Sequence, residues 1–195
     1  LRDLYLSRGP AAAFAANGLF WGAFGALVPV IKAQVGLSDG EFGLALLMAS
    51  AGAVVAMWLA PLSERALGTK ALPLLTLMMG LAVLLPAQTV AGVSFALAML
   101  AVTASSGTMD VVMNARISAL EATSRRSLMN LNHAVFSAAY AVSAVLTGLA
   151  REAGVSAVWI LAGVALAIML SVFQVVAAPV RDPESDDSES AAAPL

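Results

Sequence analysis

Five stretches of this sequence contain no Asp, Glu, Lys or Arg, and each is more than 20 residues long. An α-helix needs about 20 mostly apolar residues to cross the hydrocarbon core of a bilayer, so each stretch is long enough to span a membrane. The stretch 71–109 is too long for one span, and the Pro, Gln, Thr and Gly between 86 and 92 favour a turn inside it. The uncharged stretches are 9–31, 42–63, 71–109, 127–150 and 153–180.

These stretches predict an all-α membrane protein, with a six-transmembrane-helix bundle over residues 1–180. The composition agrees, because 61% of the residues are hydrophobic and only 11% are charged, far from the balance of an ordinary soluble domain. The remaining residues, 181–195, are rich in Asp, Glu and Ser and predict an acidic cytoplasmic linker or tail. The six predicted spans lie near 11–32, 40–62, 71–88, 93–117, 127–149 and 155–179.

The absence of cysteine limits the chemistry open to the chain. It excludes disulfide bonds, thiolate nucleophiles and thiolate metal sites, and we expect neither a cofactor nor a metal ion. The formal net charge is −2, and the acidic tail accounts for it, so we expect no nucleic-acid partner. The composition points instead to the lipid bilayer as a partner.

Positive charge predicts the orientation of the bundle, since cytoplasmic loops collect Lys and Arg. With a cytoplasmic N-terminus, the outer segments hold only Lys32 and Arg151, and the remaining cations fall on the inner side. We therefore predict a multi-pass protein of the cell (inner or plasma) membrane with both termini in the cytoplasm. The inner cations are Arg2, Arg8, Arg65, Lys70, Arg116, Arg125, Arg126 and Arg181.

Two local patterns predict how particular helices begin and pack. Ser38 followed three residues later by Glu41 is the capping-box pattern, which places the start of the second span at the outer surface. In the first span, Gly18 and Gly22 form a small-xxx-small patch that indicates close packing of two helices.

Polar side chains inside the predicted spans are the candidates for function, because an ionisable group in the membrane is costly and usually has a partner. Asp110 and His133 lie on the fourth and fifth spans, which a short cytoplasmic loop joins. Folding the chain about that loop predicts a ladder of polar pairs along a shared seam. Simple helix-to-helix hydrogen bonding is the alternative interpretation. The predicted pairs are Asp110 with His133, Asn114 with Asn130, Ser106 with Ser137, and Thr103 with Tyr140.

The loop sequence APLSERALGTK, residues 60–70, resembles the cytoplasmic signature of the major facilitator superfamily between its second and third helices. Glu64, Arg65, Gly68 and Lys70 carry the likeness, with Glu in place of the usual Asp. The segments GTMDVVMNARISALE and SRRSLMNLNHAVFSAAYAVSA resemble the fourth and fifth helices of the bacterial fucose-permease-like, or sugar-permease-like, branch of that family.

This resemblance implies an N-terminal six-helix half made of two inverted three-helix repeats. The implied function is secondary active or facilitative transport of a small polar solute by alternating access. A sugar is one candidate solute, and proton coupling is one candidate mechanism. The second six-helix half would come from a separate chain, a missing C-terminal half or a second copy of this chain.

The resemblance also assigns roles to residues. The first and fourth helices would line the cavity, so Asn17, Trp21, Thr103, Ser106 and Asp110 become candidate contacts for substrate or proton. Asp110 is the candidate titratable group, which Asn114, Asn130 and His133 would arrange. Ser137 and Tyr140 complete the candidate set on the fifth helix, and the loop residues Glu64, Arg65, Gly68 and Lys70 would form a conformational latch.

Two other classes of protein compete with the transporter. A half-size structural or regulatory membrane subunit, or an inactive remnant of a split transporter, would also have six helices. An intramembrane serine protease is a remote alternative, because ASSG at 104–107 is near that family's nucleophile motif and His133 is the single histidine. Such an enzyme needs its base within hydrogen-bond reach of the serine, whereas the predicted ladder pairs Ser106 with Ser137. We therefore expect a protein that is not an enzyme.

Overall fold

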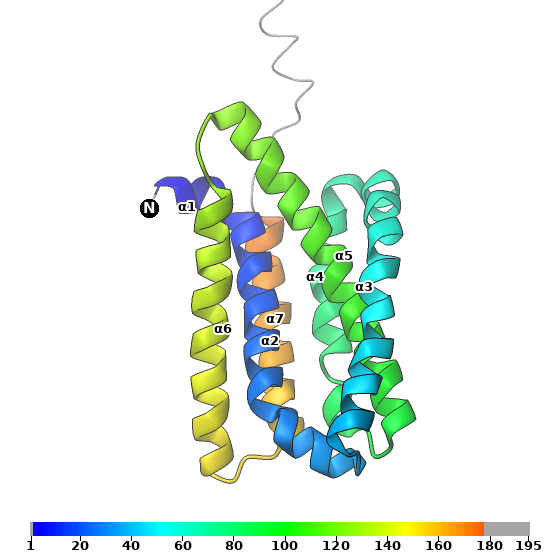
Figure 1. Cartoon of the computed structure of the whole chain (residues 1–195). Coiled ribbons are helices and arrows are strands. Elements are labelled where there is room, and N and C mark those ends of the chain that lie inside the picture. The colour runs from blue at the N-terminus through cyan, green and yellow to red at the C-terminus, as the bar shows by residue number, and fades with distance from the viewer. Residues whose placement is uncertain (1, 178–195) are drawn as a thin grey trace, which may run out of the picture.

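The computed structural model of the chain describes residues 2–177, so the predicted acidic tail at 181–195 lies outside the described residues. Within that range the chain is helical and contains no strand, which confirms the predicted all-α membrane fold (Figure 1). The elements are α1 (Arg2–Leu6), α2 (Arg8–Val35), α3 (Asp39–Leu67), η1 (Gly68–Lys70), α4 (Ala71–Ala82), η2 (Pro86–Gln88), α5 (Gly92–Ser124), α6 (Met129–Glu152) and α7 (Ala157–Val176).

Five segments of the described chain are long and apolar enough to cross a membrane. One of them, Asp39–Gln88, covers 50 residues, and the chain reverses within it at η1 to make α3 and α4 antiparallel neighbours (Figure 1). Gly68 occupies this turn with φ 52° and ψ −124°, a backbone conformation that glycine adopts without the steric cost other residues have. Two antiparallel helices, α3 and α4, therefore come from this one apolar segment.

The predicted span at 71–88 is not a single α-helix. α4 ends at Ala82, and the rest of the segment forms a turn and the short helix η2. Pro86 has no backbone N–H, so it cannot continue the helical hydrogen bonds. The carbonyls of Ala87 and Thr89 accept hydrogen bonds from Nε2 of Gln34 at 2.9 and 2.6 Å, and this side chain thereby ties the turn to the end of α2.

The helices pack in a pattern that two repeats would produce. The most extensive contacts join α2 to α6 and α3 to α5, followed by α2 to α7, α4 to α5, α4 to α7 and α2 to α5. Exchanging α2 with α5, α3 with α6 and α4 with α7 leaves this set of pairs unchanged. Each exchanged pair also runs in opposite directions, since α2 descends in Figure 1 where α5 ascends. The packing is therefore that of two inverted three-helix repeats.

Glycines allow the two largest interfaces to form. A Cβ on Gly18 would lie 2.3 Å from the Phe136 carbonyl oxygen, and one on Gly22 would lie 2.1 Å from that of Tyr140. The α3–α5 interface has an equivalent position in Gly52, where a Cβ would lie 2.6 Å from the Leu100 carbonyl oxygen. The predicted packing role of Gly18 and Gly22 is confirmed.

Side chains also fix the beginnings of two helices. The capping box predicted at the outer end of α3 is confirmed, because the Ser38 hydroxyl accepts from the Glu41 amide and the Glu41 carboxylate accepts from the Ser38 amide. At α6 the residue before the helix is Leu128, which has no capping group. Oε1 of Glu121 accepts instead from the amides of Leu128 and Met129, at 2.5 and 2.8 Å. Glu121 thus satisfies donors that the helix start leaves unpaired.

Candidate functional site

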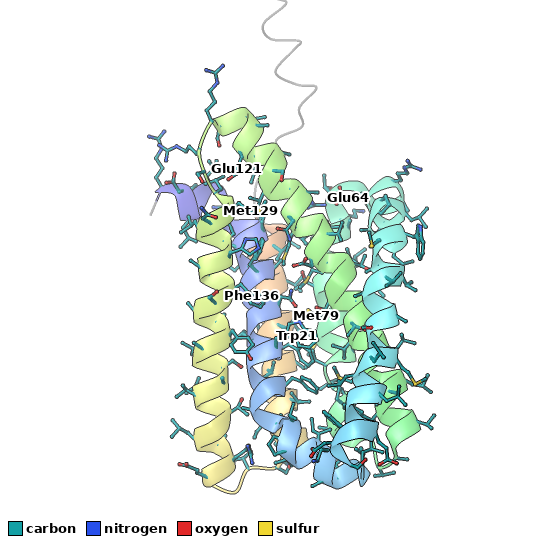
Figure 2. All side chains as sticks on the ribbon, viewed as in Figure 1. Trp21, Glu64, Met79, Glu121, Met129 and Phe136 are labelled. Atoms are coloured by element: carbon teal, nitrogen blue, oxygen red, sulfur yellow. The ribbon has the colours of Figure 1, made fainter. Side chains whose placement is uncertain are left out.

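Three polar side chains meet where α2 crosses α5, near the middle of the bundle. Asn17 and Trp21 lie four residues apart on α2, and therefore share one face of that helix. Nε1 of Trp21 donates to Oγ of Ser106 at 3.2 Å, and the Ser106 hydroxyl donates to Oδ1 of Asn17 at 2.8 Å. Figure 2 shows Trp21 about midway along the bundle, between α2 and α5. The two helices predicted to line a cavity are thus joined by hydrogen bonds at this depth.

Burial distinguishes the members of this cluster. Asn17 and Ser106 are buried, at 5% and 4% exposure, whereas Trp21 is half-buried. Two aromatic rings of the same helix flank the indole, with the Phe20 centroid 5.0 Å away and the Phe24 centroid 6.0 Å away. An apolar shell with a few directed polar groups is the usual makeup of a small-molecule site.

Asp110 lies one turn further along α5 from Ser106, about 6 Å toward the end of the helix at Ser124. Its side chain is half-buried, and so is that of Asn114 on the next turn. Nδ2 of Asn114 donates to the backbone carbonyl of Asp110 at 2.8 Å, a bond within the helix. Ser106, Asp110 and Asn114 therefore follow one face of α5, as the sequence spacing predicts.

The polar stripe of α6 carries the remaining candidate residues. Asn130, His133, Ser137 and Tyr140 are exposed, although His133 also packs its ring against Phe14 of α2 with centroids 5.0 Å apart. Nδ1 of His133 lies 3.1 Å from the Met129 carbonyl oxygen, and the Ser137 hydroxyl donates to the His133 carbonyl at 2.9 Å. These bonds stay within α6 and leave the stripe available to another surface.

The predicted ladder between the fourth and fifth helices is wrong for two of its pairs, Ser106 with Ser137 and Thr103 with Tyr140. α5 and α6 touch little, because α2 packs against both of them. Ser106 bonds to Asn17 and Trp21 of α2, and not to Ser137. The Thr103 hydroxyl donates to the Ala49 carbonyl of α3 at 2.5 Å, while the Tyr140 hydroxyl lies beside Gly25 of α2. Folding the chain about a loop assumes that consecutive helices pack together, and here the larger interfaces join helices that are not consecutive.

The same geometry separates the two residues that the protease alternative would need. Ser106 makes its hydrogen bonds to α2, and the His133 ring bonds to Met129 and packs on Phe14. In the described part of the chain no hydrogen bond joins the Ser106 hydroxyl to the His133 ring. A general base is thus not positioned to activate this serine.

The loop resembling the family signature contacts α5 through Arg116, which the sequence does not predict as a site residue. Arg116 donates from Nη2 to Oε1 of Glu64 and to the Gly68 carbonyl, both at 2.9 Å. Arg65 and Lys70 are exposed. Glu64 lies at the same end of the bundle as Glu121 (Figure 2). The signal for Arg116 is its position, two residues after Asn114, near the end of a helix that faces this loop. That position indicates a contact between the guanidinium group and the loop.

A second buried polar residue was also missed. Asn132 is fully buried on α6, and its Nδ2 donates to the Ser7 hydroxyl at 3.1 Å and to the Leu128 carbonyl at 2.8 Å. Asn130, which the sequence predicts as the site residue, is exposed. The buried residues of α6 are Asn132, Ser143 and Thr147, and they define the face that packs on α2. Their spacing along the helix is the signal that distinguishes the buried Asn132 from the exposed Asn130.

Comparisons with known proteins give one informative relative. No family model matches the sequence, and no solved structure matches it. The chain is 34% identical over 164 residues to an uncharacterized MFS-type transporter from Yersinia pestis. The aligned part covers 82% of this chain and 40% of that relative, so the chain spans less than half the length of the protein that it matches. The similarity is therefore to one part of an MFS-type transporter.

Proposed function

We propose that this chain forms one six-helix half of a carrier that moves a small polar solute across the cell membrane by alternating access. The observation that carries the proposal is the crossing of α2 and α5, where Asn17, Trp21 and Ser106 form a hydrogen-bonded cluster at mid-depth. The inverted packing of the two three-helix units supports it, since carriers of this kind bind their solutes at the interface of such repeats. The resemblance to the fucose-permease-like branch makes a sugar the first solute to test.

The distribution of cations supports an orientation with α1 on the cytoplasmic side. Arg8 donates to the Ala177 carbonyl at 2.5 Å, and Arg126 pairs with Asp3, so the start of α2, the end of α7 and the α5–α6 loop share one end. Lys32 pairs with Asp39 at the other end, where Arg151 donates to the Ala26 carbonyl. Cytoplasmic segments collect Lys and Arg, which favours the cation-rich end as the inner one.

Asp110 is the group that we assign to coupling. It is the one acidic side chain on the part of α5 between Gly92 and Arg116, and it lies one turn from the α2–α5 cluster. A carboxyl group in a transmembrane helix is costly and is typical of ion or proton pathways. Asn114 and the exposed stripe Asn130, His133, Ser137 and Tyr140 would line the path toward the second half.

The pair of Arg116 and Glu64 is the proposed latch between conformational states. It joins the end of α3 to α5 at the cation-rich end, together with the Arg116 bond to the Gly68 carbonyl. Because the pair holds the end of α3 and the loop after it against α5, it would fix the surface that this half presents to the second half in one conformational state. Arg65 and Lys70 are exposed beside it and would contact lipid headgroups or the second half.

The test is uptake into vesicles that contain this chain together with the polypeptide that supplies the other six helices, or with a second copy of this chain. Candidate sugars and other small polar solutes are screened with and without an imposed pH gradient. The proposal expects saturable uptake of one class of solute, and a gradient effect if a proton is coupled. Absence of uptake in every combination, with a stably folded chain, would contradict it and would favour a structural subunit or an inactive remnant.

A further inference from the structure

The hydrogen bonds at the α2–α5 crossing have a defined direction. The indole N–H of Trp21 can only donate, so Oγ of Ser106 is the acceptor in that bond. The Ser106 hydroxyl then has one hydrogen to give, and its acceptor is Oδ1 of Asn17 at 2.8 Å. The chain from indole to hydroxyl to amide oxygen therefore fixes which way the Asn17 amide faces.

The other end of the Asn17 amide has no such partner. In the described residues Nδ2 of Asn17 makes no hydrogen bond to the protein, while Oδ1 is held by Ser106. The buried side-chain atoms without a partner are Nε of Arg8 and Oδ1 of Asn132, so Nδ2 of Asn17 is not sealed from solvent. Asn17 is 5% exposed, so its NH2 group, with two N–H donors, lies at the edge of the buried region without a protein acceptor.

The charges around this amide select among solutes with oxygen acceptors. α2 carries two cations. Along the helix axis, Arg8 lies about 14 Å from Asn17, and Lys32 lies about 16 Å from Trp21. On α5 the next cation is Arg116, about 15 Å from Ser106. Two ionisable groups lie closer along the chain: Asp110, one turn from Ser106, and His133, whose ring packs on Phe14, three residues before Asn17. The Asp110 carboxylate would repel an anion and accept a hydrogen bond from a hydroxyl group.

We propose that Ser106 is a positioning residue that turns the Asn17 amide so that its NH2 group binds an oxygen of a neutral, hydroxylated solute. This inference rests on the proposed carrier function and names the solute class of that same site. Asn17 donates to the solute, Asp110 accepts from a solute hydroxyl, and the Trp21 ring supplies an apolar face beside them. Ser106 acts through Asn17, because its own hydrogen-bonding groups are engaged by α2.

The test uses the full chain in lipid nanodiscs with Trp58→Phe and Trp159→Phe, so that Trp21 is the remaining tryptophan. Both replaced residues are exposed, at 66% and 73%, which makes the substitutions mild. The probes are neutral pentoses, hexoses and alditols, each matched with its sugar acid. Trp21 fluorescence reports binding, and the indole N–H resonance in an 15N-labelled sample reports the Ser106 bond.

The expected result is a fluorescence response to a neutral probe and a weaker or absent response to its acid. Asn17→Asp keeps the oxygen that Ser106 bonds but removes the donor, and should raise the apparent Kd about tenfold or more. Ser106→Ala should shift the indole N–H resonance and raise Kd roughly threefold to tenfold. Ser105→Ala is the matched control, since that hydroxyl bonds to carbonyls of its own helix, and both readouts should stay unchanged.

Several results would overturn the inference. They are a preference for the sugar acids, no response to any neutral probe, or equal affinity of the Asn17→Asp, Ser106→Ala and parent proteins. An indole resonance that Ser106→Ala leaves in place would also overturn it. Failure of the carrier proposal is distinguishable, because it would appear as no uptake in the vesicle assay. Failure of this inference alone would appear as uptake that Asn17→Asp leaves unchanged.

Discussion

Nη2 of Arg116 lies 2.9 Å from Oε1 of Glu64, and this ion pair joins α5 of one three-helix unit to the end of α3 in the other. The same guanidinium donates to the carbonyls of Gly68 and Thr69, at 2.9 and 3.4 Å. One side chain thus satisfies a carboxylate and two carbonyls at the end of α3. Planar guanidinium groups suit this task, because their donors are fixed in a fork.

Arg116→Ala should therefore lower the stability of the folded chain, by about 1 kcal/mol, since Glu64 is partly exposed and solvent screens the pair. Arg116→Lys should recover only part of the loss, because an ammonium group cannot bond all three acceptors in the same geometry. Thermal unfolding in detergent, followed by size-exclusion chromatography, measures the effect. The exposed Arg65 provides the control, and Arg65→Ala should behave as the parent. Equal melting of the Arg116→Ala and parent proteins would show that the contact is incidental.

Alanine at Gly22 or Gly52 should destabilise the bundle by about 1–3 kcal/mol, because the added Cβ would overlap the backbone of the neighbouring helix. Neither helix can yield without moving a whole interface. Gly148→Ala in α6 is the matched control, since a Cβ there meets nothing within 4 Å and alanine favours a helix more than glycine does. Reversible unfolding in mixed micelles compares the three variants. Similar stability of all three would rule out the close packing described for α2–α6 and α3–α5.

Glu121→Ala should cost about 1–2 kcal/mol, the usual effect of removing a helix cap, because the amides of Leu128 and Met129 lose their shared acceptor. The effect should be local, so hydrogen exchange at the first turn of α6 should increase more than exchange at its centre. Thr123→Ala, an exposed position on the last turns of α5, is the comparison. Unchanged exchange at residues 128–132 in Glu121→Ala would contradict the capping role.

Engineered disulfides can test which helices are neighbours, and the absence of native cysteine makes the experiment direct. Ala56→Cys with Gly107→Cys should cross-link α3 to α5, because a Cβ at 107 would lie 3.0 Å from that of Ala56 and a shift of about half an ångström reaches the disulfide range. Ser106→Cys with Ser137→Cys should not cross-link, since Ser106 bonds to α2. Mobility shifts after mild oxidation show the outcome. Efficient linkage of 106 to 137, with none of 56 to 107, would restore the α5–α6 ladder.

The sequence was sufficient to predict the elements of this fold but not all of their neighbours. Long uncharged segments mark membrane helices because the hydrocarbon core admits little else. The cap at Ser38 and the packing glycines Gly18 and Gly22 were also predictable, since each depends on residues close in sequence or on the small size of one side chain. The interruption after Ala82 was missed because hydropathy does not register the proline that ends the α-helical hydrogen bonds.

The candidate site was predictable as a set of residue types but not as a set of contacts. The residues Asn17, Trp21 and Ser106 were each singled out, yet Ser106 was paired with Ser137 on the wrong helix. Hydropathy does not encode which helices cross, and the insertion of α2 between α5 and α6 depends on small residues distributed over two interfaces. Arg116 and Asn132 were missed for the same reason, because their roles depend on partners 52 and 125 residues away.

Uphill transport by an Asp110→Asn variant tests the central claim most directly. Wild-type chain and the variant are reconstituted with the second six-helix half, and accumulation of the identified solute is measured under an imposed pH gradient beside downhill exchange. We predict that Asp110→Asn inserts and exchanges solute but no longer accumulates it, because the asparagine cannot carry a proton. Accumulation equal to the wild type would contradict the role of Asp110 and the coupling mechanism built on it.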